Sequence, residues 1–405
     1  MNVIVGQSGG PTAVINASLA GVYEAAKKAG AENVYGMKNG ITGVLEDNLV
    51  RLEDVLDTPE KVELLKRTPS SWLGSCRYKL KSEEVNPADY ERIFFVLEKY
   101  KIDYFFYIGG NDSMDTTAKL SAYAKKIGSS VRFVGIPKTI DNDLMCTDHA
   151  PGFGSAAKFI ATSLKEVIHD AMVYDMKSLV VVEIMGRNAG WLTAASALAA
   201  GEDCDGVDMI FLPETCFDLD EFIRKIEAKQ KTKGNLVVAV SESLKVADGR
   251  FVCELADSAQ EEDSFGHKRL TGTARFLAEE CTRRLGIKTR AIELSTLQRC
   301  AAHLLSLTDV TEAFEAGMAA LKAAMDGKSG VAVVLNRISN TPYRCEMGVV
   351  DVSNIANGEK TIPLEWIDLE NACMREEFLA YVKPLIQGEV APMYRDGLPC
   401  YLHKI

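Results

Sequence analysis

The sequence of 405 residues lacks several patterns that would assign it at once to a class of protein. Its ten cysteines contain no CxxC pair and no cluster with metal-site spacing, which favours a reduced, cytoplasmic protein over a disulfide-bonded secreted one. No apolar run reaches the roughly 18 residues of a membrane span, and the first residues lack the basic start and long apolar region of a signal peptide. Internal repeats and low-complexity segments are also absent from the sequence.

Positive charge is scarce as well. The chain has 46 Lys and Arg against 57 Asp and Glu, which gives a formal net charge of -11 and a pI near 5.2. This balance argues against a nucleic-acid partner held by bulk electrostatics, and we also expect no membrane partner. With 47% hydrophobic residues, the chain has the composition of an ordinary soluble protein and the length of two domains. Any anion chemistry must therefore come from individually placed residues.

Short apolar runs rich in β-branched and aromatic residues alternate with helical patterns, which predicts βαβ units and parallel sheets. The runs cover residues 3–5, 104–108, 131–136, 179–184, 209–212, 236–240 and 331–335. The segment 11–28 predicts a helix, because Ile15, Leu19, Val22 and Ala26 fall on one face. We expect an α/β fold of two doubly wound Rossmann-like domains with the active site in the cleft between them, and a boundary near residue 150.

A glycine-rich stretch, VGQSGGPT at 5–12, follows the first predicted strand and opens the first predicted helix. Its glycines let backbone N–H groups face an anion at the positive end of that helix. The alternative is a tight turn that binds nothing. The stretch matches neither GxGxxG nor GxxxxGK[ST], which disfavours a dinucleotide-dependent oxidoreductase.

Two further motifs follow predicted strands, and in open α/β sheets ligands bind at such strand ends. GGNDS at 109–113 offers an amide and a carboxylate after two glycines, although its Asn and Asp could instead cap a helix. PKTIDND at 137–143 places Lys138 three residues before Asp141, with Asp143 beyond it. A hydroxyl that attacks phosphorus needs a base and a phosphate-binding cation, so this motif favours phosphoryl transfer. A turn stabilised by Asp and Asn side chains is the alternative.

Taken in order, these motifs resemble the phosphofructokinase family. Further segments that resemble it are LGSCR at 73–77, EIMGRNAGWLTA at 183–194, SES around Glu242 and TRAIELSTLQR at 289–299, so the resemblance spans about residues 5–300. The pair Asp112 and Lys138 resembles the branch that uses inorganic pyrophosphate, because ATP-using relatives have glycine at both positions. A carboxylate at 112 would repel the inner phosphate of ATP by about 4 kcal/mol at 4 Å and an effective dielectric near 20.

The resemblance implies a role for each matching residue. Asp141 would be the base that deprotonates the sugar 1-hydroxyl, with Lys138, Asp112 and Arg187 as further catalytic residues. The residues implied for the phosphoryl donor are Gly9, Gly10, Arg77, Gly110 and Ser113. The residues implied for fructose 6-phosphate are Thr139, Ile140, Asp141, Asp143, Met185, Gly186, Arg187, Glu242, Arg290 and Arg299, of which the last two would grip the 6-phosphate. Asn111 stands where many relatives have a magnesium-binding aspartate and is the candidate metal ligand.

The resemblance also implies how the domains divide the work. Residues 1–150 plus about 300–350 would bind the donor, and 151–299 plus about 351–405 would bind fructose 6-phosphate. We expect a magnesium-dependent, reversible transfer from pyrophosphate to fructose 6-phosphate, catalysed by a cytoplasmic homodimer or homotetramer. Allosteric regulation should be weak or absent, because Thr296 and Ser178 replace a histidine and an intersubunit arginine of the bacterial ATP enzymes. An ATP-dependent kinase, a non-catalytic regulatory subunit that binds sugar phosphate, and other acceptors such as sedoheptulose 7-phosphate stay open.

Overall fold

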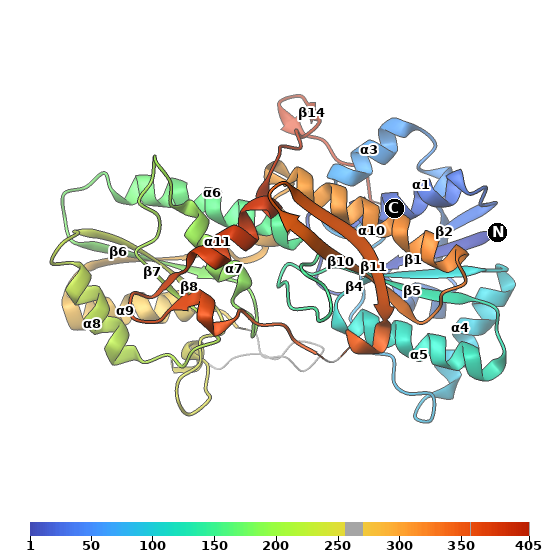
Figure 1. Ribbon diagram of the computed structural model, residues 1–405, viewed down its shortest axis with the longest axis horizontal. Coiled ribbons are helices and arrows are strands. Elements are labelled where there is room, and N and C mark those ends of the chain that lie inside the picture. The colour runs from blue at the N-terminus through green and yellow to red at the C-terminus, as the bar shows by residue number, and fades with distance from the viewer. Residues whose placement is uncertain (256–269, 357, 405) are drawn as a thin grey trace. The chain divides into compact units, whose positions relative to one another are not determined.

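The computed structural model describes residues 1–255, 270–356 and 358–404 (Figure 1). These residues form two compact units. Unit 1 comprises Met1–Ser155, Arg299–Glu359 and Gln387–Ile405, and unit 2 comprises Ala156–Gln298 and Lys360–Ile386.

The C-terminal segment differs from the sequence-based expectation, which assigned 351–405 to the second domain. Only Lys360–Ile386 belongs to unit 2. The end of the chain returns to unit 1 because its backbone is bonded there: the Leu402 N–H donates to Thr68 Oγ1, and Trp72 Nε1 donates to the His403 carbonyl.

Unit 1 contains a seven-stranded sheet in the order β11-β10-β5-β4-β1-β2-β3. The strands are β1 (Asn2–Gln7), β2 (Asn33–Met37), β3 (Leu49–Arg51), β4 (Tyr104–Gly109), β5 (Arg132–Pro137), β10 (Val331–Asn340) and β11 (Tyr343–Asp351). The five inner strands are parallel, while β3 and β11 pair antiparallel at the edges. The four apolar runs predicted for this region are confirmed as strands β1, β4, β5 and β10.

Helices cover both faces of the unit 1 sheet. They are α1 (Ile15–Lys28), α2 (Ile41–Leu45), α3 (Pro59–Arg67), α4 (Pro87–Lys99), α5 (Asn111–Ile127) and α10 (Leu307–Met325). Alternate residues of β1 face opposite cores: Val3 and Val5 pack with α1 and α10, and Ile4 packs with α4 and α5. The first helix begins at Ile15 rather than Pro11, so residues 11–14 remain in the glycine-rich loop.

Unit 2 contains a four-stranded parallel sheet in the order β7-β8-β6-β9. Its strands are β6 (Ser178–Ile184), β7 (Met209–Phe211), β8 (Asn235–Ser241) and β9 (Lys288–Glu293). Its helices are α6 (Phe153–Ala171, from Ala156 onward in this unit), α7 (Trp191–Ala194), α8 (Leu219–Lys229), α9 (Thr273–Leu285) and α11 (Glu376–Val382). Leu179 and Val238 pack against α8 and α9 in one core.

Short elements complete the two units. Two small hairpins pair β12 (Ile367–Asp368) with β13 (Cys373–Met374) and β14 (Tyr394–Arg395) with β15 (Leu398–Pro399). The 3-10 turns are Leu52–Asp54, Ala195–Ala199, Val252–Leu255, Ser295–Arg299, Ala302–Leu304, Val352–Asn354, Leu364–Trp366 and Lys383–Ile386.

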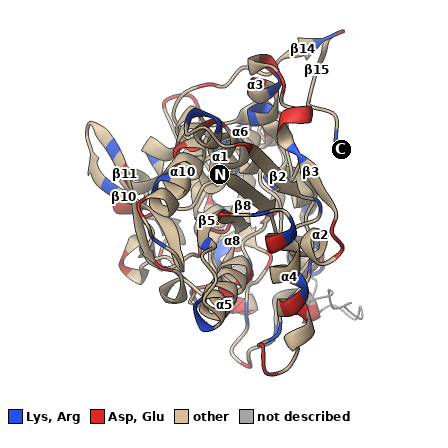
Figure 2. Cartoon of the chain, turned by 90° about the vertical axis from the view of Figure 1, so that its right-hand side faces the viewer, with Lys and Arg blue, Asp and Glu red and all other residues tan. Residues whose placement is uncertain are grey.

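Charged side chains of both signs and ten cysteines are distributed over the two units. Acidic and basic residues mix along helices α3 and α4 rather than forming blocks of one sign (Figure 2). All ten cysteines are free thiols. Among the helices in the described part of the chain, none combines the length and hydropathy that a membrane span requires.

Candidate active site

Three neighbouring parallel strands of unit 1 each end in one of the predicted motifs. In the ladder, Gln7 of β1 lies opposite Ile108 of β4, and Gly109 of β4 lies opposite Pro137 of β5. The glycine-rich loop, GGNDS and PKTIDND therefore start side by side at the carboxyl edge of the sheet. This edge is where open α/β sheets bind their ligands.

Two cationic side chains of unit 1 reach the glycine-rich loop. Lys138 is only 3% exposed, and its ammonium group donates a hydrogen bond to the Gly10 carbonyl. A Cβ placed on Gly9, whose φ is +75°, would lie 3.4 Å from Lys138 Nζ, and one placed on Gly10 would lie 3.4 Å from Arg299 Nη1. Arg299 Nε is buried without a hydrogen-bond partner among the described residues. Two cations thus lie close to two consecutive glycines, an arrangement that suits a phosphate group.

Helix α5 points its N-terminus toward the same sheet edge. Its N-cap residue is Gly110, which has no side chain to cap the helix, and Asn111 and Asp112 already belong to the first turn, so the alternative that Asn or Asp of GGNDS is the N-cap is wrong. Ser113 Oγ fills the space beside Gly109, where an added Cβ would lie 1.9 Å from it. The first turn of α5 can therefore present backbone N–H groups to an anion.

Two polar side chains on that first turn differ in their surroundings. Asn111 Oδ1 is buried and has no hydrogen-bond partner in the part of the chain that the structure describes. The Asp112 side chain is half exposed and lies 3.7 Å from the Nζ of Lys79, a partner that sequence analysis missed. The exposed pair weakens the repulsion that Asp112 exerts on a phosphate, because water and Lys79 both screen its charge.

The loop after β5 carries the predicted base. Asp141 and Asp143 are half-buried, while Ile140 and Asn142 are buried. The Asp141 N–H donates to Thr139 Oγ1 over 3.1 Å, and Asn142 Oδ1 accepts from the Ala150 N–H over 3.0 Å. Asn142 therefore stabilises the turn, as the alternative for this motif proposed, while the two carboxylates on either side of it keep partly exposed surface.

The segment that leads to Arg77 is tied to the glycine-rich loop by buried amides. Asn16 Nδ2 donates to the Thr68 and Ser70 carbonyls, both over 2.7 Å. Gln7 Oε1 accepts from the Leu73 N–H over 3.0 Å.

Beyond these amides, Ser75 Oγ donates to the Gly9 carbonyl over 2.7 Å, and Arg77 is exposed two residues later. Sequence analysis missed Gln7 and Asn16. The available signal was a polar residue inside the predicted first strand for Gln7, and one beside the apolar face of the predicted first helix for Asn16.

Unit 2 holds the second group of predicted residues, at the carboxyl ends of β6 and β8. Gly186 and Arg187 have positive φ values of 154° and 48°. Glu242 Oε1 accepts hydrogen bonds from both of their N–H groups, over 3.3 and 3.2 Å. The Met185 N–H donates to Gln298 Oε1 over 3.0 Å, and Gln298 is another buried residue that sequence analysis missed. Glu242 and Gln298 therefore hold the backbone from which the exposed Arg187 projects.

The structure places the two arginines predicted for the 6-phosphate in different units. Arg299 belongs to unit 1, whereas Arg290 lies on β9 in unit 2, where it is mostly exposed and 3.4 Å from Asp170. Their joint grip on a phosphate stays a prediction.

A buried carboxyl next to the Met185 loop was also missed. Glu183 on β6 is 5% exposed, and its Oε2 accepts from the Ala274 N–H at the start of α9 over 2.9 Å. Burial raises the pKa of Glu183 to about 7. This side chain therefore titrates in the physiological range, one strand residue before the loop that carries Met185.

Comparisons with known proteins show the family to which this chain is similar. The family model described as Phosphofructokinase matches residues 2–324. The chain is 42% identical over 405 residues to a protein of Methylococcus capsulatus named pyrophosphate--fructose 6-phosphate 1-phosphotransferase, covering 99% of this chain and 95% of that one. A protein of Halomonas elongata with the same name is 40% identical, with coverage of 98% and 94%.

A solved structure shares the fold of the whole chain. It is a pyrophosphate-dependent phosphofructokinase from Nitrosospira multiformis, which is 38% identical to this chain with a TM-score of 0.89 and coverage of 100% and 97%. This likeness, the five parallel inner strands of unit 1 and the parallel sheet of unit 2 confirm the predicted α/β fold with two Rossmann-like domains.

Proposed function

The chain belongs to the phosphofructokinase family, and we propose that it transfers a phosphoryl group reversibly from pyrophosphate to the 1-hydroxyl of D-fructose 6-phosphate. The products are fructose 1,6-bisphosphate and phosphate. Full-length similarity to relatives named for this reaction supports the proposal. The structural observation that carries it is the buried Lys138, which lies against the Gly9–Gly10 loop together with Arg299.

Unit 1 binds the phosphoryl donor, pyrophosphate. The glycine backbone, the first turn of α5 and the two cations can hold the oxygens of pyrophosphate through charge-assisted hydrogen bonds. Lys138 is the main determinant of donor choice in this account, because it occupies space that glycine leaves open in ATP-using relatives. Asp112 contributes less, since it is half exposed and paired with Lys79.

The transfer step requires a base and a stabilised phosphoryl group. Asp141 accepts the proton of the 1-hydroxyl while that oxygen bonds to the terminal phosphorus, and the bridging P–O bond breaks to release phosphate. Lys138 offsets the negative charge on the phosphoryl oxygens during this step. Thr139 holds the loop of Asp141 by accepting its N–H.

Acceptor binding falls to Met185, Gly186, Arg187 and Glu242 of unit 2, with Arg290 and Arg299 proposed for the 6-phosphate. Glu242 is already engaged by two backbone N–H groups. Its role is therefore to hold Arg187 in place as well as to face the sugar. Arginine suits the phosphate because its planar fork makes paired hydrogen bonds.

We propose Mg²⁺ as the metal, with Asn111 as a ligand. Asn111 Oδ1, which is buried without a hydrogen-bond partner among the described residues, fits this role, because an amide oxygen is a hard ligand that magnesium accepts directly or through water. When bound, the ion would neutralise charge on the pyrophosphate oxygens.

A donor and acceptor panel on the purified protein tests the proposal. Turnover should be high with pyrophosphate and low with ATP at equal concentration, and higher specificity for ATP would replace the proposal with an ATP-dependent kinase. No turnover with any donor would favour the regulatory-subunit alternative. Sedoheptulose 7-phosphate belongs in the acceptor arm, because the sequence motifs leave the length of the sugar phosphate open.

We also propose a cytoplasmic, weakly regulated homodimer or homotetramer. The ten free thiols support a reducing compartment. Light scattering measures the oligomeric state, and turnover curves at varied fructose 6-phosphate measure the regulation, for which we expect hyperbolic saturation.

A further inference from the structure

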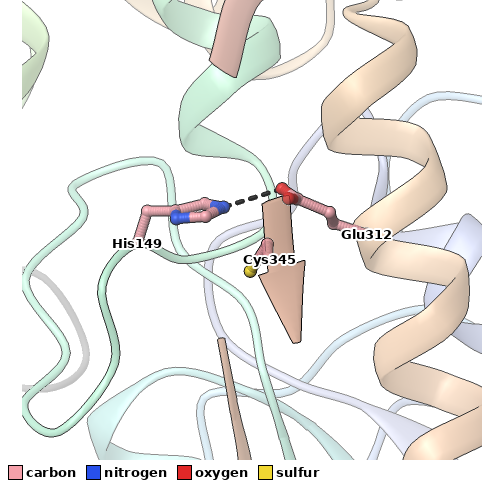
Figure 3. Close-up of side chains that lie close together, drawn as sticks. All are labelled: His149, Glu312 and Cys345. Atoms are coloured by element: carbon pink, nitrogen blue, oxygen red, sulfur yellow. Dashed lines mark hydrogen bonds and ion pairs between the residues drawn. The ribbon is translucent and has the colours of Figure 1, made fainter. Parts of the chain in front are cut away.

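A buried network of charged side chains lies behind the loop that carries Asp141. His149, eight residues after Asp141 in the same loop, has a side chain only 2% exposed. Its Nδ1 lies 2.8 Å from Asp148 Oδ1, and its Nε2 lies 2.7 Å from Glu312 Oε2. Figure 3 shows the imidazole facing Glu312 of α10, with the thiol of Cys345 on β11 beside them.

The two carboxylates determine the charge of His149. Both ring nitrogens face acceptors, and an imidazole donates from both only when it is protonated. Burial alone lowers the pKa of His149, but the hydrogen bonds to Asp148 and Glu312 outweigh it and raise that pKa above its usual 6.5. The titratable groups that lie against the ring are Asp148 of the loop, Glu312 of α10, and Tyr343 and Cys345 of β11. Further charged groups lie next to these: Arg337 of β10 contacts Asp148, and Asp309 and Glu315 stand one turn to either side of Glu312 on α10.

Each carboxylate has a further partner that holds it in place. Arg337 lies 2.8 Å from Asp148 Oδ1, and the hydroxyl of Tyr343 donates to Glu312 Oε1. The network therefore joins the loop to α10 and to the β10–β11 hairpin, all within unit 1.

A metal ion is the alternative occupant of this cluster, because ligand atoms of His149, Glu312 and Cys345 lie within 4.8 Å of one another. The chemistry of the three groups argues against it. A doubly hydrogen-bonded imidazolium has no lone pair for a metal, and burial together with the charge of Glu312 raises the pKa of the Cys345 thiol to about 12. The hydrogen bonds satisfy His149 and Glu312 without an ion.

Backbone hydrogen bonds connect the segment around His149 to the segment that contains Asp141. The Asp148 N–H donates to the Leu335 carbonyl over 2.9 Å, the Ala150 N–H donates to Asn142 Oδ1, and the Thr139 N–H donates to the Pro151 carbonyl over 3.2 Å. The second half of the loop thus fixes the first half, which contains Asp141. We propose that His149, held between Asp148 and Glu312, is a positioning residue that fixes the loop of Asp141 for phosphoryl transfer.

This inference rests on the proposed function, so its test has one readout that needs activity and one that does not. The variants are His149→Gln and Glu312→Gln, with Cys345→Ala as the matched control from the same cluster. Turnover of pyrophosphate and fructose 6-phosphate is measured between about pH 6 and pH 9. Backbone hydrogen exchange of residues 138–152 is followed over the same range.

The wild type should lose turnover at alkaline pH, because the contribution of an imidazolium is full below its unfolded pKa and is lost as pH rises through its raised folded pKa. This fall in turnover on the alkaline side of the pH profile is the alkaline limb. Glu312→Gln should move the alkaline limb to lower pH, because Glu312 helps to raise the pKa of His149. His149→Gln should abolish the limb and lower kcat ten- to hundredfold with little change in the KM of pyrophosphate. Cys345→Ala should match the wild type.

An alkaline limb unmoved by Glu312→Gln, or unchanged exchange protection of residues 138–152 in His149→Gln, would overturn the inference. So would stoichiometric bound zinc that Cys345→Ala removes. If a variant does not fold, the wild type alone gives the test: its loop protection should fall as pH rises through the pKa of His149. A wild type that shows this exchange behaviour without transferring phosphate would contradict the proposed function and leave the positioning role standing.

Discussion

Gln7 Nε2 donates a hydrogen bond to Asn16 Oδ1 over 2.7 Å, and both side chains are completely buried. Between them they bind the backbone of Thr68, Ser70 and Leu73, which precedes Arg77. The first strand, the first helix and a segment more than fifty residues away are therefore joined by two amides beneath the glycine-rich loop.

Asn16→Leu should weaken donor binding and stability together. It removes the hydrogen bonds of Asn16 to the Thr68 and Ser70 carbonyls and to the Trp72 N–H, and it leaves Gln7 Nε2 with only its longer contact to the Ile15 carbonyl. Each buried group left unsatisfied costs about 1–3 kcal/mol. We expect a raised KM for pyrophosphate, a smaller change in the KM of fructose 6-phosphate and a lower Tm. Ser18→Ala on the same helix is the control, because Ser18 is buried and its Oγ has no partner among the described residues. Equal effects on both KM values would contradict the assignment to the donor side.

Asp141→Asn keeps the shape of the proposed base and removes its proton affinity. Turnover should fall about a hundred- to ten-thousandfold, the usual worth of general-base assistance, while the KM values change little. Steady-state kinetics in both reaction directions measure this. Asp115→Asn, a helix-surface change beside Lys119, should leave turnover unchanged. Near-normal turnover of Asp141→Asn would reject its role.

Lys138→Met preserves the buried volume and removes the cation from the glycine-rich loop. We expect kcat/KM for pyrophosphate to fall by at least about a hundredfold, because a charged hydrogen bond in a buried site is lost. The double variant Asp112→Gly, Lys138→Gly should shift the pyrophosphate-to-ATP ratio toward ATP. Lys79→Met is the control for charge alone, and it should change that ratio only slightly, since exposed ion pairs contribute about 0–1 kcal/mol.

Asn111 should set the magnesium requirement. Asn111→Leu should raise the Mg²⁺ concentration for half-maximal activity, and Asn111→Asp should lower it, because a carboxylate binds the ion more strongly than an amide. Magnesium titrations at saturating pyrophosphate measure the shift, and calorimetric titration of the ion gives it without turnover. Identical titrations for both variants would remove Asn111 from the metal site.

Glu183 should make stability depend on pH. Its folded pKa of about 7 lies above the ordinary value of 4.5, so the folded state holds the proton more tightly and stability falls as pH rises between these values. The full loss is about 3 kcal/mol at most. Glu183→Gln should remove this decline and be more stable than the wild type near pH 8, while still accepting the Ala274 N–H. The measurement is the free energy of unfolding of both proteins from denaturation curves at pH 6 and pH 8. If it changes equally with pH in the wild type and in Glu183→Gln, the assignment to Glu183 is wrong.

Local patterns predicted the inner strands β1, β4, β5 and β10 of unit 1, but neither the inner strand β2 nor the edge strand β9 of unit 2. Val3, Ile4 and Val5 form a short apolar run between turn signals, so their strand could be predicted from neighbouring residues alone. Strand β9, Lys288–Glu293, alternates charged and partly exposed residues and has no apolar run. Only its pairing with β6 makes it a strand. An edge strand without an apolar run forms because it pairs with another strand, and that strand lies far away in the sequence.

The same division applies to the site. The sequence by itself determined that the glycines of residues 5–12, Lys138 and Asp141 follow buried strands, because apolar runs and turn residues can be recognised from adjacent positions in the chain. Only the tertiary structure decided that Lys138 bonds to Gly10, that Arg299 reaches the same loop, and that His149 meets Glu312 on a helix more than 150 residues away. Such contacts depend on the order of strands in a sheet and the packing of helices upon it. Their geometry is set by the whole unit, and no spacing along the chain encodes it.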